Sequence, residues 1–143
     1  MQVTIDTSEV FGNIDAVAAM LRGELVKAVA QGCLVVEGAA KQNCPVDEGQ
    51  LRDSIQHQVD EEDSEIIGRV GTNVFYAPYK EFGTGIFAVD GNGRKTPWVY
   101  KNKDGEFRWT KGSRPKPFLY PALIQNQDRV KAVMVKHLRD VLK

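Results

Sequence analysis

Apolar residues recur at intervals of three and four between positions 14 and 43, which is the period of an amphipathic helix. The stripe consists of Ile14, Val17, Ala18, Leu21, Leu25, Ala28, Val29, Cys33, Val36 and Ala40. We predict a helix from Ile14 to Asn43, with Asn13 as its N-cap and Pro45 ending it. Its three glycines each cost about 1 kcal/mol relative to alanine and permit either close packing or a bend: Gly23, Gly32 and Gly38.

Alternating apolar and polar residues predict strands before and after an acidic turn. Residues 1–12 read as a short strand or arm that Gly12 and Asn13 close, and residues 46–49 read as a turn. Residues 54–59 and 65–72 predict a hairpin whose turn is Asp60–Asp63. Residues 74–82 are rich in aromatics and predict a short helix or turn after Pro78.

A second helix is predicted from Pro121 to about Leu142, and it completes the expected fold. Its apolar face is Leu123, Val130, Met134, Leu138 and Val141. Two helices and at least four short strands predict one α+β domain over residues 1–143, with both helices on one face of an antiparallel sheet. Burial of Leu25 and Leu138 in that packing is part of the prediction.

Residues 86–113 differ in composition from the rest of the chain. Two aromatic runs, 98–100 and 107–109, flank Asp104-Gly105, which is a strong hairpin signal. The segment holds more basic than acidic residues. We therefore expect an inserted hairpin arm that projects from the domain or extends its sheet.

Composition narrows the class of protein. Lys+Arg and Asp+Glu both number 19, so the chain has no global bias toward nucleic acid and little repulsion between copies. No signal peptide and no membrane-spanning run is expected. Cys33 and Cys44 lie too far apart on one helix for a disulfide, so we read both as reduced thiols in a cytosolic protein.

Residues that could carry chemistry are scattered, and no catalytic constellation forms. Gly83-Thr84-Gly85 lacks the spacing of a phosphate loop and reads as a tight turn. His57 and His137 have no clustered partners, so we read them as structural or surface residues and expect no metal or cofactor. A hydrolase using Glu81 or His57 therefore has no support in the sequence.

Glu81 stands among aromatic residues, and an acid that is partly buried there would need a partner. Arg52 and Arg114 are the candidate partners, in an ion pair that fixes the loop ending in Gly83-Thr84-Gly85 or a subunit contact. The alternative is an exposed acid on a short helix, and the residues alone favour neither.

The aromatic residues of the arm, Trp98, Tyr100, Phe107 and Trp109, stand beside lysines. They could stack nucleic-acid bases. Pairing between the aromatic residues across the hairpin needs fewer assumptions, and we favour it.

Three segments carry a family resemblance. They are residues 45–55 (PVDEGQLRDSI), 76–84 (YAPYKEFGT) and 115–122 (PKPFLYPA), in an order and spacing that span about residues 14–143. The chain resembles the siphophage head–tail joining, or tail-completion, family, also called minor tail components. Glu48 replaces the usual threonine of the first segment, and the arm is longer than in compact members.

The resemblance implies a non-enzymatic virion protein of a phage or prophage. It would form a ring, of six copies when assembled, at the neck between the head-side connector and the tail-tube or terminator proteins, after assembly in the bacterial cytoplasm. The isolated subunit is expected to have weak self-affinity, so that it can be monomeric before assembly. The candidate interface or loop-ordering residues are Arg52, Tyr76, Tyr79, Glu81, Phe82, Trp98, Trp109, Arg114 and Phe118. The competing hypothesis is a small cytosolic nucleic-acid-binding or regulatory module that uses the basic aromatic arm.

Overall fold

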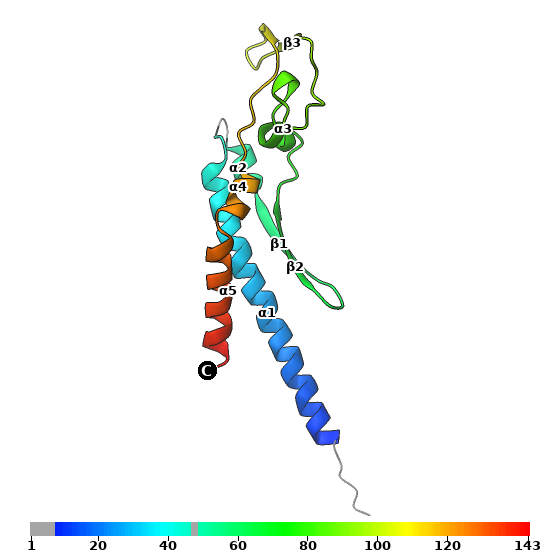
Figure 1. The fold of residues 1–143 in the computed structure, drawn as a ribbon, viewed down its shortest axis with the longest axis vertical. Helices are drawn as coiled ribbons and strands as arrows, with labels where there is room; N and C mark the ends of the chain where they lie inside the picture. The colour runs from blue at the N-terminus through cyan, green and yellow to red at the C-terminus, as the bar shows by residue number, and fades with distance from the viewer. Residues whose placement is uncertain (1–7, 47–48) are drawn as a thin grey trace, which may run out of the picture.

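One long helix, α1 (Ser8–Asn43), is the axis of the molecule in the computed structural model, which describes residues 8–46 and 49–143 (Figure 1). The helix begins six residues before the predicted start, so Gly12 and Asn13 lie inside it. The expected strand is therefore wrong for residues 8–12, and its first seven residues lie outside the described part. Extending an existing helix costs far less than nucleating one, which explains why weak helix formers do not stop it.

The hairpin of β1 (Gln56–Glu61) and β2 (Ile66–Gly71) lies against α1. Its antiparallel register pairs His57 with Val70 and Glu61 with Ile66, which confirms the predicted hairpin to within two residues. Arg22 of α1 donates to the carboxylate of Glu61 at 3.1 Å. The acidic turn is exposed, and α1 holds the base of that turn.

The C-terminal helices pack on another side of α1 (Figure 1). They are α4 (Leu119–Ile124) and α5 (Gln127–Val141), so the single helix predicted from Pro121 is wrong in that it is interrupted. The side-chain amide of Asn126 donates to the carbonyl of Ala122 at 2.8 Å, while its own backbone N–H goes to Leu123. A side chain that competes for backbone partners in this way breaks the helical ladder.

The core lies at the end of α1 where the short helices meet it. These are α2 (Gln50–Ser54), which the sequence analysis did not predict, and α3 (Ala77–Phe82), which it did. The predicted turn before α2 includes residues 47–48, which lie outside the described part. The buried cluster is Val36, Ala40, Cys44, Leu51, Ile55, Ala77, Phe118 and Ala122.

The other end of α1 is bare. Residues 15–20 of α1 are exposed, and Figure 1 shows this part of the helix extending past both the hairpin and α5. Leu25 is 39% exposed and Leu138 is half-buried, so the predicted burial of these two residues is wrong. The apolar stripe of α1 is longer than the surface that its own chain offers to cover it.

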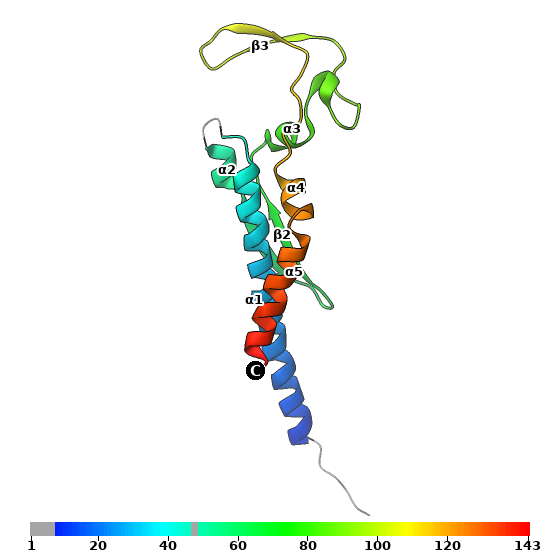
Figure 2. The ribbon, with the colours of Figure 1, turned by 60° about the vertical axis from the view of Figure 1, so that its left-hand side comes forward.

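The arm consists of β3 (Trp98–Lys101) and β4 (Phe107–Thr110), preceded by the 3-10 turn η1 (Gly85–Phe87). It projects beyond the end of the helices in both ribbon views (Figures 1 and 2). The two hairpins form separate two-stranded sheets. The fold is α+β, as predicted, with a long N-terminal helix on a sheet, a C-terminal helix and an inserted arm. None of the helices described here is long and apolar enough to cross a membrane.

Candidate interface: the arm, its base and an apolar groove

Glu81 is the buried charged residue that the sequence analysis singled out, and it is 7% exposed. Its carboxylate accepts hydrogen bonds from the backbone N–H groups of Phe118, Leu119 and Tyr120, at 2.8, 3.0 and 2.9 Å. These N–H groups open α4, where a helix has no internal acceptors for them. Glu81 therefore ties α3 to α4 by capping the second helix.

The expected arginine partner of Glu81 is wrong, because backbone donors occupy both carboxylate oxygens. Arg52 instead donates from its Nε to Asp53 at 3.3 Å on the surface. Arg114 lies with its guanidinium 4.8 Å from the centroid of the Phe87 ring. Arg114 thus stacks on Phe87 at the base of the arm. Among the interactions of the described residues, Arg52 makes no contact with the arm.

The arm begins and ends at one place, because residues 83–87 lie beside residues 111–115. The N–H of Thr84 donates to Ser113 O at 2.9 Å, and the N–H of Ile86 donates to Lys111 O at 3.1 Å. Gly83 and Gly85 have φ of 77° and 63°, which only glycine adopts readily. This confirms the tight turn predicted at Gly83-Thr84-Gly85. The turn lets residues 83–87 lie against residues 111–115 with their backbones in contact.

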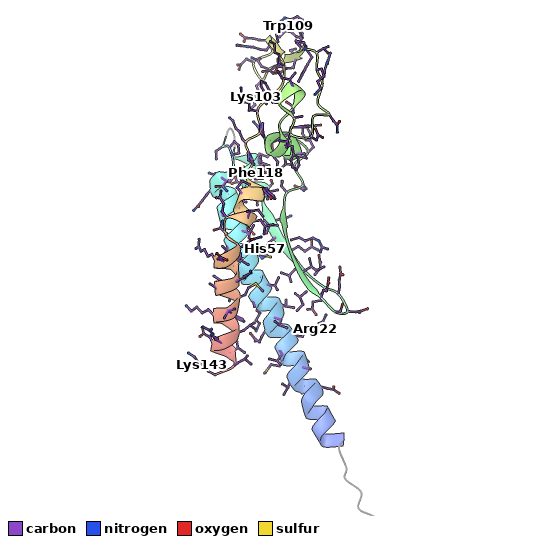
Figure 3. The ribbon with its side chains drawn as sticks, in the orientation of Figure 1. Arg22, His57, Lys103, Trp109, Phe118 and Lys143 are labelled. Carbon is purple, nitrogen blue, oxygen red and sulfur yellow. The ribbon has the colours of Figure 1, made fainter. Side chains whose placement is uncertain are left out.

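The two most exposed aromatic residues of the arm share one face. Val99 pairs with Trp109, and Lys101 with Phe107, so these four residues share one face. Trp109 is 77% and Phe107 is 76% exposed. Trp98, on the other face, is half-buried beside the guanidinium of Arg94. We call Val99, Phe107 and Trp109 the arm face; Figure 3 shows Trp109 at the far end of the molecule from Lys143.

The predicted aromatic pairing across the arm is wrong. In the observed register, Trp98 faces Thr110 and Tyr100 faces Arg108, so no aromatic residue of the arm faces another directly. The offset places each aromatic ring opposite a non-aromatic side chain, which is a threonine, a valine or a charged residue. The aromatic residues of the arm therefore remain available for contacts outside the arm.

An apolar groove of about 720 Å³ opens on the body. Its floor is α1 at Val29 and Val36, one wall is β2 at Val70, and the other wall is α4 and α5 at Leu123 and Met134. α3 and the loop before it close one end, with Phe75 and Phe82 among the lining residues. We call this surface the groove.

The remaining predicted site residues fall into two places. Phe82 is 57% exposed and lines the groove, and Tyr79, 56% exposed, lies one turn before it on α3. Tyr76 packs against the core and reaches Gln50 through its hydroxyl group at 3.4 Å. Phe118 is completely buried beneath the arm, so it is a core residue and not a contact residue (Figure 3).

The groove is what sequence reasoning missed. Its residues come from five elements, and several of them, including Leu123 and Met134, were assigned to the buried face of the last helix. An alternating strand or an amphipathic helix shows which face is apolar, but not whether another element covers that face. The sequence does carry one signal of an open apolar surface: it has more apolar residues in its periodic segments than one short domain can bury.

The histidines are structural. His57 on β1 contacts Glu37 of α1 at 2.5 Å, and His137 on α5 contacts Glu24 of α1 at 2.8 Å. The hydrogen bonds from His137 and Lys27 lower the pKa of Glu24. Burial alone would raise the pKa of Glu37, but hydrogen bonds from His57 and Lys41 outweigh it, so that pKa is also lowered.

The remaining polar groups do not assemble a metal site. Burial raises the pKa of the Cys33 thiol, which keeps it protonated against β2. Cys33 and Cys44 are both reduced, as the sequence analysis expected. Within residues 8–46 and 49–143, no three His, Cys, Asp or Glu side chains are placed to hold a metal ion together.

A protein-family model described as "Bacteriophage HK97-gp10, putative tail-component" matches residues 9–83, just over half of the 143-residue chain. The matched range contains α1, the β1–β2 hairpin and α3, and it ends at Gly83, where the arm begins. No curated protein and no solved structure matches the chain.

Proposed function

Because the chain belongs to the HK97-gp10-like family of bacteriophage tail components, we propose that it is a ring subunit of the phage neck. Family membership makes it a structural component of the tail and gives it a place in the virion. The proposal adds that six copies form a ring after assembly in the host cytoplasm. This ring joins the head-side connector to the tail-tube or terminator proteins.

The observation that carries the proposal is the amount of apolar surface that the single subunit exposes. Phe107, Trp109 and Phe75 are each more than three-quarters exposed, and the groove lies open on the body. Exposed apolar patches of this kind mark protein–protein contacts in stable proteins. Zero net charge adds little repulsion between neighbouring copies. A subunit that works alone would gain nothing from these surfaces.

The base of the arm supports a role in positioning. The N–H of Val89 donates to Phe82 O at 2.9 Å and that of Lys116 to Lys80 O at 2.7 Å, so both ends of the arm are held to α3, and Glu81 holds α3 to α4. A contact made by the arm is therefore transmitted to the helices of the body. A joint between two larger assemblies needs such a connection.

Removing the arm tests the proposal. Residues 88–111 are replaced by a short Gly-Ser linker, which leaves Gly83, Thr84 and Ser113 in place. Because the two ends of the arm lie side by side, we expect a folded, soluble protein that no longer joins heads to tails. The variant is tested for complementation of a phage or prophage that lacks the gene. Electron microscopy shows whether heads and tails are joined. A tagged parent protein is located separately in intact virions.

Each other outcome contradicts part of the proposal. Absence of the tagged parent from the neck would remove the neck assignment. An unfolded deletion variant would make the arm part of the core, and full activity of the variant would make the arm dispensable.

The nucleic-acid module is the competing proposal, and it uses the same arm. The arm holds six basic and three acidic residues, and three of its aromatic residues, Tyr100, Phe107 and Trp109, are exposed. Binding to phosphates weakens steeply as salt rises. Salt-dependent binding of single-stranded DNA that disappears with the arm would favour this alternative, whereas we expect no such binding.

A further inference from the structure

We propose that the arm face of one subunit, Val99, Phe107 and Trp109, docks into the groove of a second copy of this chain. The inference rests on the proposed ring, and it names the contact by which neighbouring subunits recognise each other. The occupant of the groove is the arm face of a neighbouring copy, and the target of the arm is the groove of another copy.

The arm face has the composition of a binding surface. Trp109 and Phe107 stand two positions apart on β4, so both point to the same side, and Val99 of β3 lies opposite Trp109. Aromatic side chains bury about 150–250 Å² each when they are enclosed, and tryptophan is enriched among the residues that dominate binding energy. An isolated two-stranded hairpin is also marginally stable in water, so a partner would stabilise it.

The groove suits such an occupant in size and polarity. A volume of about 720 Å³ lies within the range of pockets that enclose a small ligand, which is room for the ends of two or three apolar side chains. Its walls are mainly aliphatic, at Val70, Leu123 and Met134. None of the described residues that line the groove belongs to the arm, and the arm projects away from the body (Figure 2).

Charge favours a second copy as the occupant. The arm, residues 86–113, holds six basic and three acidic residues. The β1–β2 hairpin supplies one wall of the groove through β2 and holds five acidic residues at and beside its turn, against two bases, Arg69 and, from α1, Arg22. The acidic hairpin attracts a basic arm and repels phosphate. One chain therefore carries both halves of a complementary pair.

The arm and the groove are different surfaces, so the contact is heterologous. Each subunit gives an arm to one neighbour and receives an arm from another. Repetition of such a contact closes into a ring when the rotation between neighbours divides a full turn, and otherwise continues as a filament. The proposed contact is therefore compatible with a neck ring.

The tryptophans provide a direct test, because the chain has two and both lie on the arm. Trp98→Phe leaves Trp109 as the single reporter. As protein concentration rises, we expect the emission of Trp109 to shift to shorter wavelength in step with an increase in mass measured by sedimentation. A protein that stays monomeric with unchanged emission over the whole soluble range would overturn the proposal.

Two variants locate the two halves of the contact. The arm variant combines Phe107→Ser with Trp109→Ser, and the groove variant is Leu123→Glu at a residue 49% exposed. Matched controls are Tyr100→Ser, on the other face of the arm, and Leu34→Glu, 55% exposed on α1 outside the groove. We expect each of the two variants alone to associate about ten-fold or more weakly than the parent, and both controls to associate like the parent.

Mixing the arm variant with the groove variant decides the geometry. The groove variant still has an arm, and the arm variant still has a groove, so the mixture should form a dimer and nothing larger. Parent-like assembly by either variant, or no dimer in the mixture, would overturn the proposal. So would an arm variant that loses binding to a single-stranded DNA oligonucleotide while its self-association is intact. The neck assignment is judged separately, by the presence of tagged parent protein in virions.

Discussion

At the scale of single residues, Glu81 shows how one carboxylate can connect two helices through backbone donors alone. Its two oxygens accept three N–H groups at the start of α4. Because the donors are backbone groups, no complementary side chain marks them in the sequence. The sequence leaves a buried, paired acid and an exposed acid open for Glu81; the structure shows the buried acid, with backbone donors in place of the expected arginine.

Glu81→Gln should destabilise the protein by about 1–3 kcal/mol, the cost of leaving buried polar groups unsatisfied. Glutamine keeps one acceptor oxygen and places an NH₂ group against backbone donors. Chemical denaturation of the variant measures the loss, with Glu65→Gln on the exposed turn as the control. A loss below about 0.5 kcal/mol, the scale of surface substitutions, would show that the cap contributes little.

Gly68 is a second residue whose place in the fold leaves no room for a side chain. A Cβ at this position would overlap the Sγ of Cys33 and lie 2.9 Å from Val29 Cγ1, so β2 and α1 approach closely here. Gly68→Ala should cost about 1–3 kcal/mol, as overpacking does. Gly71→Ala, in the same strand with open space around its Cβ, is the matched control and should be nearly neutral. Equal unfolding free energies for the two variants would refute the close approach.

At the scale of elements, the glycines of α1 separate into two kinds. A Cβ at Gly32 would lie 3.0 Å from Val130 Cγ1 and 3.3 Å from Met134 Sδ on α5, whereas Gly38 has open space. The sequence alone permits either close packing or a bend at Gly23, Gly32 and Gly38. Close packing applies to Gly32 alone, and neither Gly23 nor Gly38 has a neighbour for an added Cβ.

Alanine substitutions should reveal this difference. Gly38→Ala should stabilise the protein by up to about 1 kcal/mol, because alanine is the better helix former. Gly32→Ala should gain less or lose stability, because α5 must shift to admit the methyl group. The difference between the two midpoints of thermal unfolding measures the cost of that shift. A larger gain at Gly32 than at Gly38 would contradict the packing of α1 on α5.

Much of the element structure could be predicted, since periodic patterns are local. The long helix, both hairpins and the short helix after Tyr76 follow from spacing and turn residues. The break at Asn126 depends on which acceptor its side chain selects, and the start of α1 depends on the low cost of extending a helix. Exposure of Leu25 depends on where neighbouring elements end. None of these three features is encoded in a local pattern.

At the scale of the whole molecule, two His–Glu contacts fasten other elements to α1. His57 joins β1 to Glu37, and His137 joins α5 to Glu24. Both glutamates have a pKa below the ordinary value of 4.5. A carboxyl group whose pKa is lower in the folded state contributes stability above its unfolded pKa and loses it as pH falls through the folded pKa.

Acid should therefore weaken the protein in a defined range. We expect the contribution of these two glutamates to the free energy of unfolding to be constant from pH 7 down to about 5 and to fall as the pH drops below about 4.5. The double variant Glu24→Gln and Glu37→Gln should show a smaller slope there. Urea denaturation at a series of pH values provides the measurement. An unchanged slope in the double variant would assign the acid sensitivity to other carboxylates.

The positions of the three motifs that carry the family resemblance, residues 45–55, 76–84 and 115–122, depend on the whole fold. The family match over residues 9–83 confirms the resemblance through the first two motifs. The third motif supplies the backbone donors that Glu81 of the second motif accepts. Segments far apart in the sequence are thus joined in space.

The stem of the arm has a consequence for how such proteins can diverge. Lys116 donates its N–H to Lys80 O at 2.7 Å, and Thr84 and Ser113 are joined by hydrogen bonds. These bonds hold the two ends of the arm together without any contact from the arm itself. An inserted segment whose ends already meet can change in length at a small entropic cost. The arm can therefore change in length during evolution while the helices beneath it keep their packing.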